Sequence, residues 1–204
     1  MYSKSSNPIY GFHGCDRRIR DAVINGEELK PSLNAYDWLG NGIYFWEGDP
    51  QRAYEWAVQA SKRKTSSVNE PAVLGAVIDL GNCFNLMNRQ SIPLLKAGYE
   101  WLKKYNNKNN FDMPQNENIG ENQDLLYRYL DCAVIQKIHE VIRSGLIPDA
   151  APFDSVKALF PEGKEVYDGA GFKEKTHIQL CIINPNCIKG YFLPRELDKE
   201  YPVP

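Results

Sequence analysis

Two of the three histidines in this 204-residue chain stand beside groups that could bind a ligand. His13 ends an apolar segment and precedes Gly14, whose missing side chain leaves the adjacent backbone N–H and C=O open to another molecule. His177 begins a late apolar segment, and Gln179 follows it on the same face because side chains alternate along a strand. Imidazole can exchange a proton near neutral pH, whereas an amide can only form hydrogen bonds. His139 lies among polar neighbours on a helical segment, where we expect a surface or flanking position.

Two tyrosines follow a glycine-rich turn. Residues 39–47 read Leu-Gly-Asn-Gly-Ile-Tyr-Phe-Trp-Glu, so the turn leads directly into β-branched and aromatic residues that favour a strand. Tyr44 lies on that strand. Asp49 and Pro50 then have the residue types of a helix N-cap and a first helical position. Tyr54 lies on the helix that we expect to follow.

The elements that must position these residues are strands and helices without strict alternation. We expect strands at 9–14, 43–46, 72–80, 153–160, 176–183 and 188–193. We expect helices between 16 and 26, after residue 50, at 91–105 and at 124–144. The asparagine-rich segment 106–123 is expected to be a long loop or insertion, flexible or used for recognition. This order predicts an α+β fold with a mixed or antiparallel sheet, in a single domain covering residues 1–204.

Composition and motifs argue against several classes of protein. The formal net charge of −2 provides no global basic field for nucleic acid. The chain lacks an apolar run of the length that spans a membrane, and residues 1–7 lack the apolar core of a signal peptide, so we expect a cytoplasmic protein. The 5 scattered cysteines predict reduced thiols, and the histidine spacing predicts no metal site. The sequence contains no phosphate loop, dinucleotide fingerprint or nucleophile elbow.

Two segments resemble the ADP-ribosyltransferase superfamily. Phe12-His13-Gly14 on a first strand is followed about thirty residues later by Gly40-Asn41-Gly42-Ile43-Tyr44-Phe45. The second segment is similar to the glycine-lysine-glycine-isoleucine-tyrosine-phenylalanine segment of the diphtheria-toxin and poly(ADP-ribose)-polymerase branch. That branch has His, Tyr and usually Glu on three separate strands. The resemblance covers residues 9–60, extends to 153–193, and leaves out the middle of the chain.

The resemblance implies an ADP-ribosyltransferase-like split sheet, mixed or antiparallel, with flanking helices. It implies NAD as a substrate and no metal. His13 would bond the adenosine ribose, and the backbone of Gly14 would pair with the nicotinamide carboxamide. Tyr44 and Tyr54 would hold the nicotinamide ring between aromatic faces, where stacking adds roughly 0.5–1.5 kcal/mol.

The third family position is where this sequence departs. The glutamate is replaced by either His177 or Gln179, because the alignment is ambiguous by two residues. A carboxylate on the preceding loop is a candidate substitute, and that loop carries Glu162, Glu165 and Glu174. Some superfamily members that lack the glutamate do not catalyse transfer.

The resemblance therefore implies an NAD-dependent ADP-ribosyltransferase acting on a macromolecule, either protein, RNA or DNA. Small members of this kind include bacterial toxins and phage-defence effectors, sometimes paired with an antitoxin protein. For a nucleic-acid acceptor, four aromatic residues could stack on bases or equally belong to the core: Tyr36, Trp38, Phe45 and Trp46. The alternatives are an NAD glycohydrolase, an RNA 2′-phosphotransferase-like enzyme, and a non-catalytic module that binds NAD or ADP-ribose.

Overall fold

The computed structural model describes residues 7–118, 124–196 and 200, and within them the chain is α+β. Its helices are α1 (Arg17–Ile24), α2 (Pro50–Ser61), α3 (Ile92–Asn109) and α4 (Tyr129–Arg143), with short 3-10 turns at Arg89–Ser91 and Pro185–Cys187. Its strands are β1 (Ile9–Asp16), β2 (Ile43–Glu47), β3 (Pro71–Ile78), β4 (Cys83–Asn85), β5 (Asn116–Glu117), β6 (Tyr127–Arg128), β7 (Ser155–Phe160), β8 (His177–Ile182) and β9 (Ile188–Phe192). The expected α+β class and the mixed sheet are confirmed.

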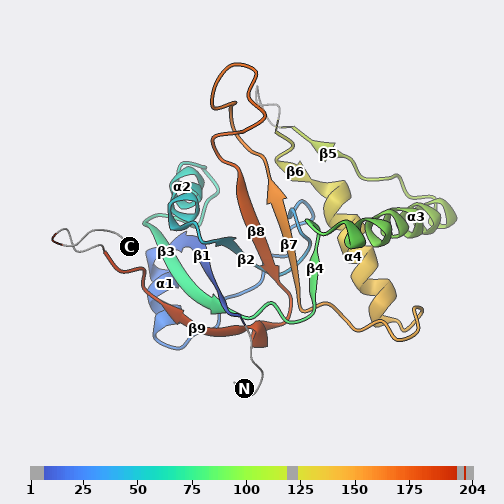
Figure 1. Cartoon of the computed structure of the whole chain (residues 1–204), viewed down its shortest axis with the longest axis horizontal. Coiled ribbons are helices and arrows are strands. Elements are labelled where there is room, and N and C mark those ends of the chain that lie inside the picture. The colour runs from blue at the N-terminus through green and yellow to red at the C-terminus, as the bar shows by residue number, and fades with distance from the viewer. Residues whose placement is uncertain (1–6, 119–123, 197–199, 201–204) are drawn as a thin grey trace.

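The main sheet has seven strands in the order β4-β7-β8-β2-β1-β3-β9. Within it, the pair β4–β7 is parallel and the other described pairs are antiparallel. Figure 1 shows α1 and α2 on the side of β1 and β3, while α3 and α4 pack together on the side of β4 and β7. The central strands β2 and β8 lie between these two groups of helices.

The first two strands of the chain separate soon after they meet. β1 pairs with β2 only at Gly11–Glu47 and Phe12–Trp46, whereas β1 pairs with β3 over all of its eight residues. Beyond Phe12, the edge of β1 that faces β2 is therefore free of strand pairing. This gap lies next to His13, the candidate ligand-binding histidine.

Two hydrophobic cores lie on opposite faces of β2 and β8. Phe45 and Leu180 belong to the core shared with β1 and β3, and Cys181 belongs to the core under α4. Since alternate residues of a strand face opposite sides, Trp46 and Gln179 share the α4 face with Cys181. Helix α2 also lies against the sheet, next to Gly14 of β1. His177 and Gln179 therefore lie on the face of β2 and β8 between α2 and α4, whereas the His13 ring contacts Phe45 of the other core.

The asparagine-rich segment is more ordered than expected, apart from residues 119–123, which lie outside the described residues. Its first four residues continue α3, and Asn110 ends that helix with a left-handed φ of 55°, which asparagine tolerates. Asn116 belongs to β5, and its side-chain oxygen accepts from the backbone N–H groups of Leu130 and Asp131 at 2.9 and 3.2 Å. The expected helix start at 124 is wrong because this capping group comes from a distant segment and fixes α4 to begin at Tyr129.

The expected surface position of His139 is also wrong. The residue is only 5% exposed, because the segment after α4 covers it, and its ring lies edge-on against Phe153 at 6.1 Å. No helix among the described residues is long and apolar enough to cross a membrane.

Candidate functional site

His13 and Gly14 lie where β1 and β2 separate. The Tyr10 carbonyl accepts from the backbone N–H of Gly48 at 2.9 Å, on the β2 side of β1. Alternate residues of an antiparallel strand direct their backbone groups to the same neighbour. The N–H and C=O of Gly14 therefore face the gap, where no described strand pairs with them.

The His13 ring is held across this gap by the backbone of β2. Its Nδ1 lies 2.7 Å from the Tyr44 carbonyl oxygen. A carbonyl can only accept, so Nδ1 carries the proton and Nε2 carries a lone pair. Burial lowers the pKa of His13, which keeps the ring neutral. His13 is thereby prepared to accept a hydrogen bond through Nε2.

Helix α2 packs directly on Gly14. A Cβ atom built on this glycine would lie 2.1 Å from the Ala53 carbonyl oxygen and 3.3 Å from the Trp56 ring. Any side chain at position 14 would push α2 away from β1. The glycine is needed for this close contact as well as for an open backbone.

Tyr44 is tied to the glycine-rich turn through its hydroxyl group. The hydroxyl donates to the Gly40 carbonyl at 2.5 Å and accepts from the Leu39 N–H at 2.9 Å. Burial raises the pKa of Tyr44 well above its usual value, so the phenol stays protonated. Tyr54 is 45% exposed on α2. The role of the two tyrosines as a clamp for the nicotinamide ring stays a prediction, because rings that hold a third ring between them do not contact each other.

His177 and Gln179 both point to the α4 face of the sheet, as the alternation predicts. His177 lies opposite Phe160 on β7, and Gln179 lies between Trp46 on β2 and Ala158 on β7. His177 Nδ1 donates to the Lys175 carbonyl at 2.8 Å, so its Nε2 carries the lone pair. Burial lowers the pKa of His177 as well.

A buried ion pair lies beside His177. Arg52 on α2 places Nη2 at 2.9 and 2.7 Å from the two carboxylate oxygens of Glu162, and its guanidinium lies 5.7 Å from the centre of the Trp46 ring. Glu162 Oε2 is 3.8 Å from His177 Nδ1. Of the three candidate carboxylates, Glu162 is buried at this position, whereas Glu165 and Glu174 are exposed.

Sequence reasoning missed Arg52. In the sequence, Arg52 is a single charged residue four positions before Trp56 on the expected helix. Many solvent-exposed arginines occupy similar positions, so its type and place do not mark it as a site residue. Its partner is 110 residues away in sequence, so only the folded structure shows the pairing.

Several buried polar atoms around this pair have no hydrogen-bond partner within the described structure. They are Trp46 Nε1, Arg52 Nε and Nη1, His177 Nε2 and Gln179 Oε1. A buried polar group left unsatisfied costs about 1–3 kcal/mol, so each such group in a native structure calls for an explanation such as a ligand. The cluster offers acceptors for hydroxyl groups and donors for an anion. No group of three or more potential metal ligands lies in residues 7–118, 124–196 and 200.

Aromatic rings form one wall of the cluster. The Trp38 ring stacks on His177 with centroids 6.0 Å apart and planes at 28°, and Phe160 contacts both rings. Of the four aromatic residues considered for base stacking, Phe45 and Trp46 are buried in the core, and Tyr36 and Trp38 remain partly exposed. Phe45 and Trp46 are therefore not available at the surface for stacking.

One relative spans nearly the whole chain. The uncharacterized protein MJ0359 of Methanocaldococcus jannaschii is 25% identical over 207 residues, which cover 92% of this chain and 89% of the relative. No protein-family model matches the chain. No solved structure matches it. The name of this relative states no activity.

Proposed function

We propose that this chain is an NAD-dependent ADP-ribosyltransferase that transfers ADP-ribose to a macromolecular acceptor. The observation that carries the proposal is the pair of buried, unpartnered acceptor atoms His177 Nε2 and Gln179 Oε1. They lie on β8, next to the strand that carries the Gly-Asn-Gly-Ile-Tyr-Phe segment. This is the strand on which the resemblance expects the group that contacts the nicotinamide ribose.

In the proposed binding mode, the acceptor and donor atoms of the site each match a different part of NAD. Ribose hydroxyls are donors and match the lone pairs of His13 and Gln179, while the lone pair of His177 is left for the acceptor. The buried N–H groups of Arg52 match the charge of the pyrophosphate, because charge-assisted hydrogen bonds are the strong ones. The backbone N–H and C=O of Gly14 match the two complementary groups of a carboxamide.

The proposed reaction is a displacement at the anomeric carbon of the nicotinamide ribose. The bond from this carbon to the nicotinamide nitrogen breaks, and nicotinamide leaves as a neutral molecule with the electron pair. An oxygen or nitrogen of the acceptor forms the new bond to the carbon. The acceptor's proton passes to His177 Nε2 and then to water. The lowered pKa of His177 keeps this atom unprotonated at neutral pH.

The charge arrangement predicts a slow enzyme. Glu162 is the carboxylate next to His177, but its charge is shared with Arg52. Losing one preorganised electrostatic group typically costs about 2.7–4 kcal/mol of barrier. We therefore expect transfer that is measurable but weak compared with enzymes that present a free glutamate.

The test is incubation with NAD labelled in its adenylate part. Protein, RNA and single-stranded DNA are offered separately, and free nicotinamide is followed in parallel. Label in one pool, lost in His177→Ala and Gln179→Ala and kept in Arg17→Ala, supports the proposal and names the acceptor class. Arg17 is a suitable control because its side chain is 57% exposed on α1. Nicotinamide release without label indicates a glycohydrolase, and label that survives both β8 substitutions shows that the site is wrongly assigned.

A non-catalytic module that binds NAD or ADP-ribose is the second candidate. It is favoured by the burial of Glu162 against Arg52 and by the absence of a carboxylate on β8, His177–Ile182. NAD binding with neither label nor nicotinamide release would establish it. The variant Gln179→Glu distinguishes the two candidates, because a latent transferase should gain transferase activity and a binding module should remain inactive.

A further inference from the structure

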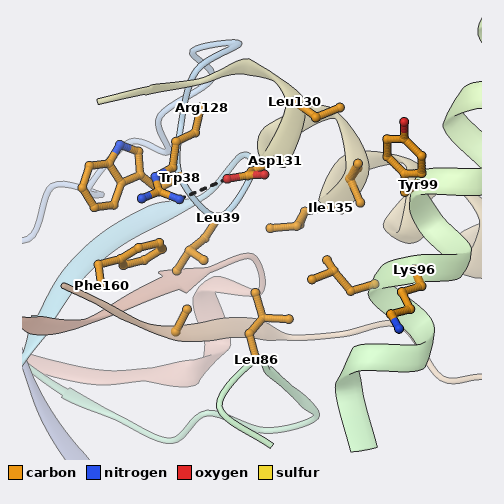
Figure 2. Close-up of a pocket in the computed structure, with 13 residues that line it drawn as sticks. Trp38, Leu39, Leu86, Lys96, Tyr99, Arg128, Leu130, Asp131, Ile135 and Phe160 are labelled. Carbon is orange, nitrogen blue, oxygen red and sulfur yellow. Dashed lines mark hydrogen bonds and ion pairs between the residues drawn. The ribbon is translucent and has the colours of Figure 1, made fainter. Parts of the chain in front are cut away.

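A cavity of about 350 Å³ lies on the other side of the aromatic wall from His177. Figure 2 shows it between α3, α4, β7 and the segment that carries Trp38 and Leu39. Its lining is mainly apolar, and the residues that form the apolar part include Leu39, Leu86, Val134, Ile135, Ala158 and Phe160. Ligand sites in proteins have volumes of roughly 300–1,000 Å³ and apolar walls with a few polar groups. The cavity has the size of a compact small-molecule site.

Charged groups lie at the two ends of the cavity (Figure 2). At one end Arg128 Nη1 pairs with Asp131 at 3.1 Å, and the Arg128 guanidinium lies 4.5 Å from the centre of the Trp38 ring. Arg128 Nε is buried and has no partner in the described structure. At the α3 end Lys96 lines the cavity beside Tyr99, and it forms no ion pair with the described residues.

The charges in this cavity are unequal. Lys96 and Arg128 contribute two positive charges, and Asp131 contributes one negative charge. The ion pair neutralises Arg128 in large part, which leaves Lys96 as the uncompensated charge. A ligand that fills the apolar middle and places one anion at the Lys96 end would bury its body and pair its charge.

We propose that this cavity binds a small ligand with an apolar body and a single anionic group. The apolar body lies against Leu39, Val134 and Ile135, and the anion lies at Lys96. This proposal does not depend on NAD binding or on transfer. It concerns a site that is separated from His177 by Trp38 and Phe160.

Binding of a ligand in the cavity can be detected through Trp38. Trp38 lines the cavity and also stacks on His177. A bound chromophore would accept energy from this tryptophan, so quenching of tryptophan emission accompanies binding.

The experiment compares two naphthalene probes on the full chain. 1-Anilinonaphthalene-8-sulfonate has an apolar body and one sulfonate, and N-phenyl-1-naphthylamine has the same body without the charge. Saturable binding of both at one site, with tighter binding of the sulfonate, is expected. Val134→Phe, which fills the cavity, should weaken both probes at least roughly tenfold. Lys96→Ala should weaken the sulfonate about threefold or more and leave the neutral probe unchanged.

Leu146→Ser is the matched control, because Leu146 is 74% exposed and outside the cavity. Unchanged binding in this variant is expected. Absence of saturable binding, binding kept in a folded Val134→Phe protein, or equal effects of Lys96→Ala on both probes would overturn the proposal. If Val134→Phe does not fold, Lys96→Ala at its exposed position still tests the proposal. The measured quantity is then the ratio of the affinities for the sulfonate probe and the neutral probe.

Discussion

The guanidinium of Arg52 and the carboxylate of Glu162 form a buried ion pair that joins α2 to the loop between β7 and β8. Their side chains are only 6% and 11% exposed, and Glu162 also lies 3.8 Å from His177. The pair therefore connects the helix that covers Gly14 with the strand that carries His177. Removing either partner leaves one charge buried without its counterpart.

We expect Arg52→Gln to lower the free energy of unfolding by about 3–5 kcal/mol, since an uncompensated buried charge remains on Glu162. Urea denaturation measures this loss. The double change Arg52→Met with Glu162→Leu should recover most of it, because no isolated charge is left. The exposed pair Arg17–Glu70 is the control, and Arg17→Ala should cost about 0–1 kcal/mol. Equal losses at Arg52 and Arg17 would show that the buried pair does not stabilise the fold.

The hydrogen bonds of two histidines predict their tautomers. His13 and His177 both direct Nδ1 to a backbone carbonyl, at 2.7 and 2.8 Å. We expect the Nδ1–H form of both rings at pH 7, roughly half a unit above the ordinary histidine pKa, with Nε2 unprotonated. Long-range proton–nitrogen NMR correlations distinguish the two ring nitrogens. A proton on Nε2 of His177 would remove the lone pair that the proposed reaction requires, and the general-base role would then be wrong.

Much of the fold could be predicted from the sequence because its local signals agree with the tertiary structure. Asp49 and Pro50 begin α2 as their types indicate, and the Asp49 side chain accepts from Arg52 N at 2.8 Å. The shared face of His177 and Gln179 followed from strand alternation alone. The elements that were missed depend on distant partners. β4 has three residues and exists through its pairing with β7, and α4 begins where Asn116 caps it.

The candidate site was predictable in its β-strand residues and in the loop carboxylate Glu162, but not in the helix residue Arg52. His13, His177 and Gln179 stand out by type, and their strands place them. Arg52 and Glu162 become visible as a pair only when the chain is folded, because neither has a local signal for the other. Tyr54 is 45% exposed and lies outside the α2 face that packs on the sheet, and its role beside the nicotinamide ring stays a prediction.

Gly14→Ala tests whether the missing side chain of this glycine is needed for the close packing of α2, apart from its effect on backbone flexibility. The added Cβ would meet the Ala53 carbonyl, a backbone atom that cannot rotate away. We expect a loss of about 3 kcal/mol in stability, because α2 must shift, and under the proposed function also a loss of NAD binding. Gly190→Ala on β9 is the matched control, since nothing lies within 4 Å of its Cβ. Differential scanning calorimetry and NAD titration measure the two effects, and a fully stable Gly14→Ala protein would contradict the close contact.

The buried His139 predicts a loss of stability in mild acid. Burial, with Arg143 adding a like charge, lowers the pKa of His139 from its usual 6.5 to about 4. Below pH 6.5 the unfolded chain binds a proton at this residue that the folded protein does not. Stability therefore falls as the pH decreases from 6.5 towards 4, by about 1–2 kcal/mol between roughly pH 6.5 and 5. His13 and His177, whose pKa values burial also lowers, act in the same direction.

His139→Phe should reduce this dependence, because the phenylalanine ring binds no proton in either state and could pack against Phe153. Urea denaturation of both proteins at about pH 6.5 and about pH 5 gives the difference directly. The dependence of stability on pH that remains in His139→Phe should come largely from His13 and His177. Adding His177→Gln should therefore reduce this dependence further. An identical pH dependence with and without His139 would mean that this histidine has the same pKa in the folded protein and in the unfolded chain, and that its burial does not lower the pKa.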